Sequence, residues 1–302
     1  MKFLLRPVFV FLMIVSFLML ALFAAAQTSE KTANVVRQPL PDLPATFSFA
    51  GESVPLQDLM VREQWDRELL YNLYQPHFLY YILKRSGRYF PIIEARLKAN
   101  GIPEDFKYLC VAESNLQNAI SKVGATGFWQ FMAGTAPGYG LEVNASVDER
   151  YHVEKSTDAA CRYLKNAFKT FGSWTAAAAS YNCGQGGYNN QATFQRTKNY
   201  YDLQLPDETS KYIFRILTFK YLMENASMFG FIISPAEKYP ALPVKIVNVD
   251  YAVANLTEFA QSHGITYKTL RDYNPWIRGR SLPARKGKTY TVLLPDQQNR
   301  LP

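Results

Sequence analysis

The sequence predicts a mainly α-helical fold, followed by a small module of two strands and two helices. From about residue 57 to 232, apolar residues recur every three to four positions, the spacing of a buried helix face, and no alternating strand pattern interrupts them. After Pro235 the pattern changes to short runs rich in β-branched residues. The chain has 302 residues, of which 48% are hydrophobic and 19% charged. It is therefore long and apolar enough for one large folded domain and a small second one.

The first 26 residues predict export. Two positive charges, Lys2 and Arg6, precede an apolar run from Val8 to Phe23, and Ala24-Ala25-Ala26-Gln27 fits a cleavage site with small side chains. We expect a signal peptide over residues 1–26 and a mature protein in the periplasm. The run is nearly long enough to span a bilayer, so an uncleaved membrane anchor is the alternative. No cysteine follows the run, which excludes lipid attachment there.

Residues 27–56 include Pro39, Pro41 and Pro44 in a background of Ser, Thr and Gln, which predicts a linker or a loosely attached N-terminal arm. A helical domain is expected over residues 57–235. Gly101-Ile102-Pro103 ends its first helical stretch. The expected helices cover, in chain order, 61–97, 103–118, 156–171, 174–181 and 209–229.

A separate module is expected over residues 240–298. Runs of β-branched and aromatic residues predict its strands, and Gly264 separates two short stretches with helical spacing. The expected elements are, in order, a strand at 244–249, helices at 256–263 and 266–273, and a strand at 289–294. A basic run at 278–288 is interpreted as a solvated face.

The net charge of +8 suits an anionic partner: a membrane surface, a nucleic acid or a cell-wall polymer. No recognised nucleic-acid motif is present, so we expect no nucleic-acid partner. Three cysteines leave at least one thiol unpaired within the chain. One bridge, for example between Cys161 and Cys183, and three buried free thiols are the two alternatives. The cysteines and the three histidines have no metal-site spacing, and we expect neither a metal nor a cofactor.

One carboxylate occupies a position where the helical pattern calls for a core residue. The helix that begins at Pro103 has an apolar stripe of Phe106, Leu109 and Cys110, and Glu113 is the next position on that stripe. Burial disfavours the charged form of a carboxyl and raises its pKa. A carboxyl that holds its proton near neutral pH suits glycosidic cleavage, because it protonates the leaving oxygen. The alternative is a structural glutamate paired with an arginine.

Two downstream segments suit a sugar with hydroxyl and N-acetyl groups. In the first, Gly124 and Gly127 allow close approach of a ligand to the backbone, Trp129 offers an aromatic face, and Gln130 offers a donor and an acceptor. The second segment, residues 180–184, places a phenol and an amide, those of Tyr181 and Asn182, at a helix end.

Together these segments resemble the family 1 lytic transglycosylases. The motifs in the family's order and approximate spacing are Glu113-Ser114, Gly127-Phe128-Trp129-Gln130, Tyr181-Asn182-x-Gly184 and Leu205-Pro206-x-Glu208-Thr209-x-x-Tyr212. The resemblance covers about residues 57–232 and is greatest to the membrane-bound lytic murein transglycosylase D group. It implies a goose-type lysozyme-like fold and a peptidoglycan glycan strand as the substrate. Ser180 and Phe128 replace the usual Ala and Leu, and neither change removes a residue that the chemistry requires.

The resemblance implies that Glu113 is the single catalytic acid/base. It would protonate the oxygen of the β-1,4 bond between N-acetylmuramic acid and N-acetylglucosamine, and then take the proton from the muramic acid C6 hydroxyl as that hydroxyl attacks C1. The product carries a 1,6-anhydro ring, no water is consumed, and no second carboxylate is needed.

The resemblance also implies roles for residues around the acid. Ser114 would donate a hydrogen bond to the substrate near the scissile bond, and Tyr212 would close the cleft. The residues expected to bind or orient the substrate are Gln130, Tyr181, Asn182 and the aromatic Trp129. Glu208 is expected to cap or to form a structural pair, since ion-pair networks often hold such carboxylates.

The C-terminal module resembles a LysM peptidoglycan-binding domain. The matching positions are Leu256, Phe259, Ala260, Gly264, Ile265, Leu270 and Tyr273-Asn274-Pro275 in the helices, with Gly287, Tyr290, Val292 and Leu294 near the closing strand. The usual Gly-Asp-Thr opening is replaced by Val253-Ala254-Asn255, so glycan binding and a purely structural role are both open. For the whole chain, the alternatives to a lytic transglycosylase are a hydrolytic muramidase on the same fold and a non-catalytic wall-binding scaffold.

Overall fold

The computed structural model describes residues 41–296. The chain divides into two units, Met1–Asp42 and Leu43–Pro302, and the fold described below belongs to the second. The predicted signal peptide, residues 1–26, lies outside the described residues. Within residues 41–296, no helix combines the length and apolar character that crossing a bilayer requires.

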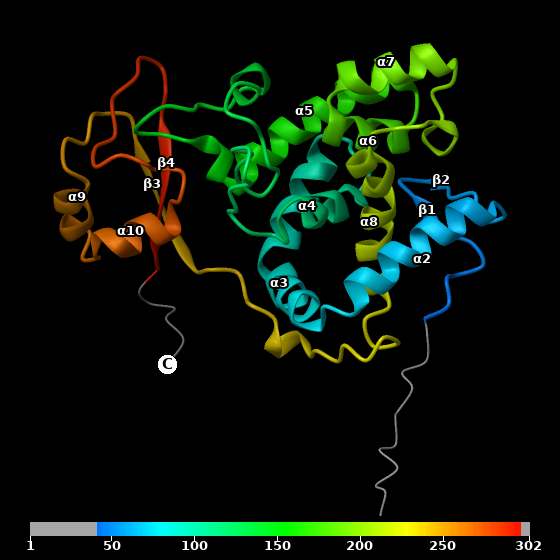
Figure 1. Ribbon diagram of the computed structural model, residues 1–302. Coiled ribbons are helices and arrows are strands. Elements are labelled where there is room, and N and C mark those ends of the chain that lie inside the picture. Colours follow the sequence, from blue (N-terminus) through cyan, green and yellow to red (C-terminus); the bar gives the residue numbers. More distant parts are fainter. Residues whose placement is uncertain (1–40, 297–302) are drawn as a thin grey trace, which may run out of the picture. The chain divides into compact units, whose positions relative to one another are not determined.

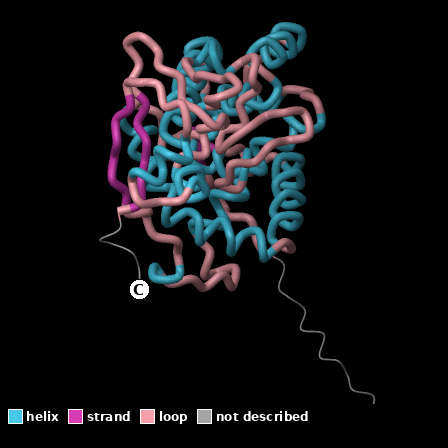
Figure 2. The backbone as a smooth tube through the Cα atoms, turned by 90° about the vertical axis from the view of Figure 1, so that its left-hand side faces the viewer, coloured by secondary structure: helices cyan, strands magenta, loops and turns pink. Residues whose placement is uncertain are grey.

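A mainly helical domain accounts for most of the described chain, as the sequence predicts (Figures 1 and 2). Its short helix α4, Phe106–Ser114, packs against α3 and α8. The apolar stripe of Phe106, Leu109 and Cys110 is fully buried. The other elements of this domain are α2 (Leu59–Leu73), α3 (Pro76–Ala99), α5 (Val153–Phe171), α6 (Trp174–Cys183), α7 (Gln185–Gln195) and α8 (Asp207–Glu224), with single 3-10 turns η1 (Ala136–Tyr139), η2 (Glu149–Tyr151) and η3 (Tyr200–Asp202), and η4 (Pro235–Glu237) following them.

Several helix boundaries differ from the prediction for local reasons. The stretch expected as one helix over 61–97 breaks at Tyr74, and α3 restarts with Pro76 in its first turn, where a missing N–H costs nothing. The helix that carries Glu113 ends earlier than expected, because Asn115 and Leu116 both take positive φ angles, 52° and 58°. The sequence analysis also missed α7, since its Gly186-Gly187 pair disfavours a helix.

The packed chain begins before the predicted domain boundary at residue 57. Within the segment expected as a linker, β1 (Ser48–Phe49) pairs antiparallel with β2 (Glu52–Ser53). Phe49 is fully buried, and its ring lies 5.2 Å from that of Phe106 on α4. The prolines and small polar residues upstream predicted a linker, but the apolar residues of 47–56 join the helical core.

The C-terminal module has the predicted β-α-α-β order. Strands β3 (Val244–Val249) and β4 (Tyr290–Pro295) pair antiparallel, and Figure 2 shows them side by side in magenta. Helices α9 (Leu256–Ser262) and α10 (Tyr267–Tyr273) lie between them in the chain. The side chain of the fully buried Asn274 donates to the Leu293 carbonyl (2.6 Å) and accepts from its N–H (2.8 Å). It thereby joins the end of α10 to β4.

All three cysteines are free thiols. Cys110 and Cys161 are buried and Cys183 is partly buried. The structure therefore favours the alternative of separate thiols over a bridge between Cys161 and Cys183.

Candidate active site

Glu113 lies in the last turn of α4 and meets the side chain of Tyr212 from α8. The Tyr212 hydroxyl donates a hydrogen bond to Glu113 Oε1. Burial raises the pKa of Glu113 from 4.5 to about 7, although the Tyr212 hydrogen bond acts in the opposite direction. The residue as a whole is only partly buried. The carboxyl group therefore holds a proton near neutral pH while the residue still reaches the surface.

Two tyrosines, the buried Tyr212 and the partly buried Tyr181, lie near this carboxyl. Tyr212 is 2% exposed, and burial together with the neighbouring Glu113 raises the pKa of its phenol well above 10. Burial and the charge of Glu113 likewise raise the pKa of Tyr181, on α6. The Tyr181 hydroxyl donates to the Trp129 carbonyl at 2.8 Å. Both phenols therefore stay protonated and act as hydrogen-bond donors.

A charged network lies behind the acid. Arg215, on α8, pairs with Glu208 at 2.7 Å and lies 3.7 Å from the buried Glu68. Arg215 lowers the pKa of Glu113 and Glu208 raises it, both by less than burial does. Glu208 thus forms the structural pair expected of it. The sequence analysis missed Arg215 and Glu68, although Glu208, Tyr212 and Arg215 share one face of a helix by their spacing.

The loop that follows α4 carries Gln130 and is fixed to the helix. Gln130 takes a φ of 48°, which a residue with a side chain rarely adopts, and its amide donates to the carbonyls of Ala119 and Gly127. Gly127 has a φ of 85°, and a Cβ there would lie 2.0 Å from the Arg150 carbonyl oxygen. The glycine is therefore required twice, for its conformation and for its close approach.

Two residues predicted to contact the substrate, Trp129 and Ser114, have buried side chains. Trp129 is fully buried and donates from its indole nitrogen to the Thr157 hydroxyl at 2.8 Å, so its ring offers no face to a sugar. Ser114 is 6% exposed, and its hydroxyl contacts the carbonyls of Cys110 and Phe128, at 3.2 and 2.8 Å. Ser114 therefore joins the Gln130 loop to α4. Aromatic and hydroxyl residues occur in cores as well as in sites, and residue type alone does not separate the two.

Asn182 joins two helices near the acid. Its side-chain oxygen accepts a hydrogen bond from the Thr209 hydroxyl at 2.8 Å, which ties α6 to the start of α8. Of the residues predicted from the motifs, Tyr212 bonds Glu113 directly. Ser114, Gln130 and Tyr181 each donate to a backbone carbonyl of residues 127–129.

A hollow of about 220 Å³ lies at α4, α8 and the α2–α3 corner, and none of the predicted site residues lines it. Ala112 and Asn115 of α4 and Arg215 of α8 form one wall, and Tyr71, Asn72, Gln75 and Phe78 from the α2–α3 corner form the other. Its aromatic rings and amides are the groups that bind sugars in water.

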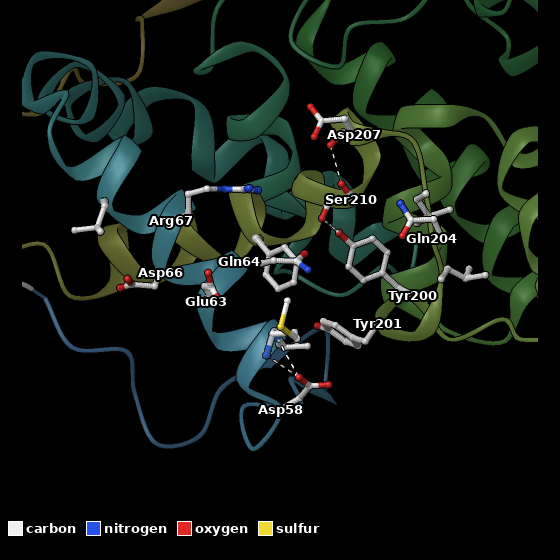
Figure 3. Close-up of a pocket in the computed structure, with 16 residues that line it drawn as sticks. Asp58, Glu63, Gln64, Asp66, Arg67, Tyr200, Tyr201, Gln204, Asp207 and Ser210 are labelled. Carbon is white, nitrogen blue, oxygen red and sulfur yellow. Dashed lines mark hydrogen bonds between the residues drawn. The ribbon is translucent and has the colours of Figure 1, made fainter.

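A larger hollow, of about 580 Å³, lies between α2 and the segment from η3 to α8 (Figure 3). Asp58, Glu63, Asp66 and Asp207 line it together with Arg67 and the rings of Tyr200 and Tyr201. None of the predicted site residues lines it. We place the candidate active site at Glu113 because its carboxyl has a raised pKa and accepts from Tyr212 while the residue still reaches the surface.

Comparison with known proteins supports the family that the motifs resemble. Residues 90–204 match the family described as the transglycosylase SLT domain, and residues 245–298 match the soluble lytic transglycosylase C-terminal LysM-like domain. The chain is similar to membrane-bound lytic murein transglycosylase D of Escherichia coli strain K12, with 26% identity over 257 residues, 82% of this chain and 55% of that protein. The protein of the same name from E. coli O6:H1 matches equally. The chain thus spans about half the length of these curated relatives. The resemblance drawn from the motifs is confirmed.

Proposed function

We propose that this chain, with its transglycosylase SLT domain and LysM-like C-terminal domain, is a peptidoglycan lytic transglycosylase. It cleaves the β-1,4 bond between N-acetylmuramic acid and N-acetylglucosamine and leaves a 1,6-anhydromuramic acid end. The observation that carries the proposal is Glu113, whose pKa burial raises to about 7 and whose carboxyl is held by Tyr212.

In the first step, protonated Glu113 gives its proton to the glycosidic oxygen as the bond to C1 breaks. The resulting carboxylate accepts the hydrogen bond of Tyr212, which limits the cost of a buried charge. In the second step, Glu113 takes the proton of the C6 hydroxyl as that oxygen bonds to C1. Glu113 therefore ends the cycle protonated, as it began.

The absence of a second catalytic carboxylate in this scheme fits the charges around Glu113. The two carboxylates that share its surroundings, Glu68 and Glu208, both lie against Arg215. Both carboxylates thus belong to a structural ion-pair network with Arg215. The substrate's own C6 hydroxyl then supplies the nucleophile.

We propose that Gln130 and the amide of Asn182 contact the acetamido and hydroxyl groups of the glycan, and that Tyr181 and Tyr212 orient the acid. The chain would act in the periplasm and near the membrane. The name of the E. coli relatives supports the membrane association, and the predicted N-terminal export segment supports the location.

The decisive experiment is a digest of purified peptidoglycan by the mature protein and by Glu113→Gln, read by mass spectrometry. Anhydro-muropeptides from the wild type alone are expected. Glu63→Gln, an identical change on the exposed face of α2, is the matched control and should release the same products as the wild type.

Two other outcomes overturn the proposal in different ways. Products with reducing muramic acid ends would make the chain a hydrolytic muramidase. No release by the wild type, combined with sedimentation of the protein on peptidoglycan, would make it a wall-binding scaffold.

A further inference from the structure

One segment of the helical domain, residues 142–151, lies between the C-terminal module and the loop that carries Gln130. On the module side, Val147 forms an antiparallel bridge with Ile277, and the N–H of Asp148 donates to the Trp276 carbonyl at 2.8 Å. The N–H groups of Arg278 and Gly279 both donate to the Ser146 carbonyl, at 2.8 and 3.2 Å. The module is therefore bonded through its backbone to the catalytic domain.

Two apolar residues of this segment pack in the core of the module. Val147 is fully buried and Tyr151 is 7% exposed, and both lie in the core cluster of the module. The guanidinium of Arg278 lies 4.3 Å from the centre of the Tyr151 ring. The module core is thus completed by two residues that the chain supplies about a hundred positions earlier.

Buried charges join the two parts as well. The side chains of Glu142 and Glu149 are 6% and 3% exposed. Lys288 of the module forms an ion pair with Glu142 and lies 3.1 Å from Glu149. Lys155 pairs with the same Glu149 oxygen, Oε1, at 2.6 Å, and the Tyr290 hydroxyl donates to Glu142 at 3.2 Å. Two neighbouring buried carboxylates need these cations, since an unpaired buried charge is costly.

The opposite side of the same segment supports the Gln130 loop. The Arg150 guanidinium donates to the carbonyls of Phe131 (3.0 Å) and Gly124 (3.2 Å), the two ends of the loop. Gly127 packs directly against the Arg150 carbonyl, with no room for a side chain between them. The strained φ of Gln130 persists because the surrounding contacts hold it.

From this chain of contacts we infer that the LysM-like module is a positioning element of the active site, and that Lys288 is a positioning residue. By pairing with Glu142 and Glu149, Lys288 fixes residues 142–151, and this segment contacts the Gln130 loop. The inference rests on the proposed function, because it assigns the loop its role in catalysis. It also differs from the role of a mobile wall-binding module that acts at a distance from the catalytic domain.

The test compares Lys288→Met with Lys268→Met in the full mature chain. Lys268 lies in the same module, is 84% exposed and pairs only with the exposed Asp272 at the surface. With a soluble oligosaccharide of alternating N-acetylglucosamine and N-acetylmuramic acid, Lys288→Met should lower kcat between about 10-fold and 100-fold, as a misplaced substrate contact does. Lys288→Arg should restore most of the rate. Sedimentation of all variants with peptidoglycan should be unchanged.

Hydrogen exchange provides a readout that does not depend on catalysis. In Lys288→Met the amides of residues 124–131 should exchange faster than in the wild type, whereas those of α5 and α6 should not. Should Lys288→Met fail to fold, Tyr290→Phe removes only the hydroxyl that donates to Glu142, and should give a smaller effect of the same kind.

Two results would overturn the inference. Equal kcat and equal exchange in the Lys288→Met and Lys268→Met proteins would show that the contact does not position the loop. Loss of sedimentation with an unchanged rate on the soluble oligosaccharide would make Lys288 part of a glycan-binding surface. If the wild type releases no anhydro product, the proposed function fails, and the exchange comparison still tests the positioning.

Discussion

At the scale of single residues, Glu113 is set by two opposing effects, burial and the hydrogen bond from Tyr212. Burial raises its pKa to about 7 and the hydrogen bond lowers it. Because the acid must be protonated to act, kcat should fall as the pH rises through about 7. Tyr212→Phe removes the lowering effect, so the midpoint of this fall should move to higher pH. The measurement is a pH–rate profile on the soluble oligosaccharide.

The matched control for this profile is Tyr188→Phe. Tyr188 is fully buried as well, but its hydroxyl donates to the Lys198 carbonyl and not to Glu113. Its midpoint should stay at the wild-type value. A Tyr212→Phe midpoint at or below that of the wild type would contradict the assignment of Glu113 as the acid.

The same pKa has a consequence for stability. The pKa of Glu113 is about 7 in the folded chain and near 4.5 in the unfolded one, so the folded state binds more protons between these values. Stability from this group is therefore lost as the pH rises through that window. Glu113→Gln should be more stable than the wild type at pH 8, on the order of 3 kcal/mol, and equally stable at pH 4. Urea denaturation at both pH values measures the difference, and equal differences at both would refute the burial argument.

The sequence predicted Glu113 because its seven-residue distance from Phe106 is a local property of one helix. It could not predict that Arg215 and Glu68 share the surroundings of the acid, since these contacts depend on how α2, α4 and α8 pack. Trp129 was assigned to the substrate because its residue type suits a sugar, whereas the fold turns its ring into the core.

At the scale of elements, two glycines of the Gln130 loop allow the cost of backbone strain to be measured apart from the cost of a close contact. Gly127→Ala and Gly124→Ala both place a side chain at a positive φ, 85° and 86°. Each should cost about 1 to 2 kcal/mol of stability. Only the Gly127 variant also meets the Arg150 carbonyl, so it should lose more stability and most activity. Denaturation and digestion assays compare them, and equal losses would argue against the close contact.

The N-terminal hairpin stabilises the helix that carries Tyr181. Glu52 of β2 accepts from the N–H groups of Trp174 (2.5 Å) and Thr175 (2.9 Å), and so caps the start of α6. Glu52→Ala should lower stability by about 1 to 3 kcal/mol, because it removes charged hydrogen bonds at a helix N-terminus. Thermal unfolding checks this, with Glu258→Ala, a partner of Asn255 in the C-terminal module, as the control. Equal midpoints for the two variants would contradict the capping role.

Elements were predictable where the apolar period continued over several turns, as in α5 and α8. Elements were not predictable where a tertiary contact decides whether a segment forms a helix or a strand. The hairpin at 48–53 is too short for a strand pattern, and α7 begins with residues that disfavour a helix.

At the scale of the described chain, the order of a helical domain and a β-α-α-β module follows from the change of pattern after Pro235. The docking of the module onto the helical domain does not follow from this pattern, because Lys288 and its glutamate partners are 139 to 146 positions apart in sequence. The basic run at 278–288 was interpreted as a solvated face, yet Lys288 reaches two buried carboxylates. Charge patterning carries no information about which partner the fold brings to a lysine.

Because Val147 belongs by sequence to the helical domain and by packing to the module core, the two parts should unfold together. Val147→Ala should lower the free energy of unfolding by about 1 to 3 kcal/mol, through the cavity it leaves. Hydrogen exchange should report the same loss in the most protected amides of α5 and of β4, since neither part keeps its core when the other opens. A loss confined to β3 and β4 would show that the module unfolds alone, and the contacts around Val147 would then be too weak to hold the Gln130 loop.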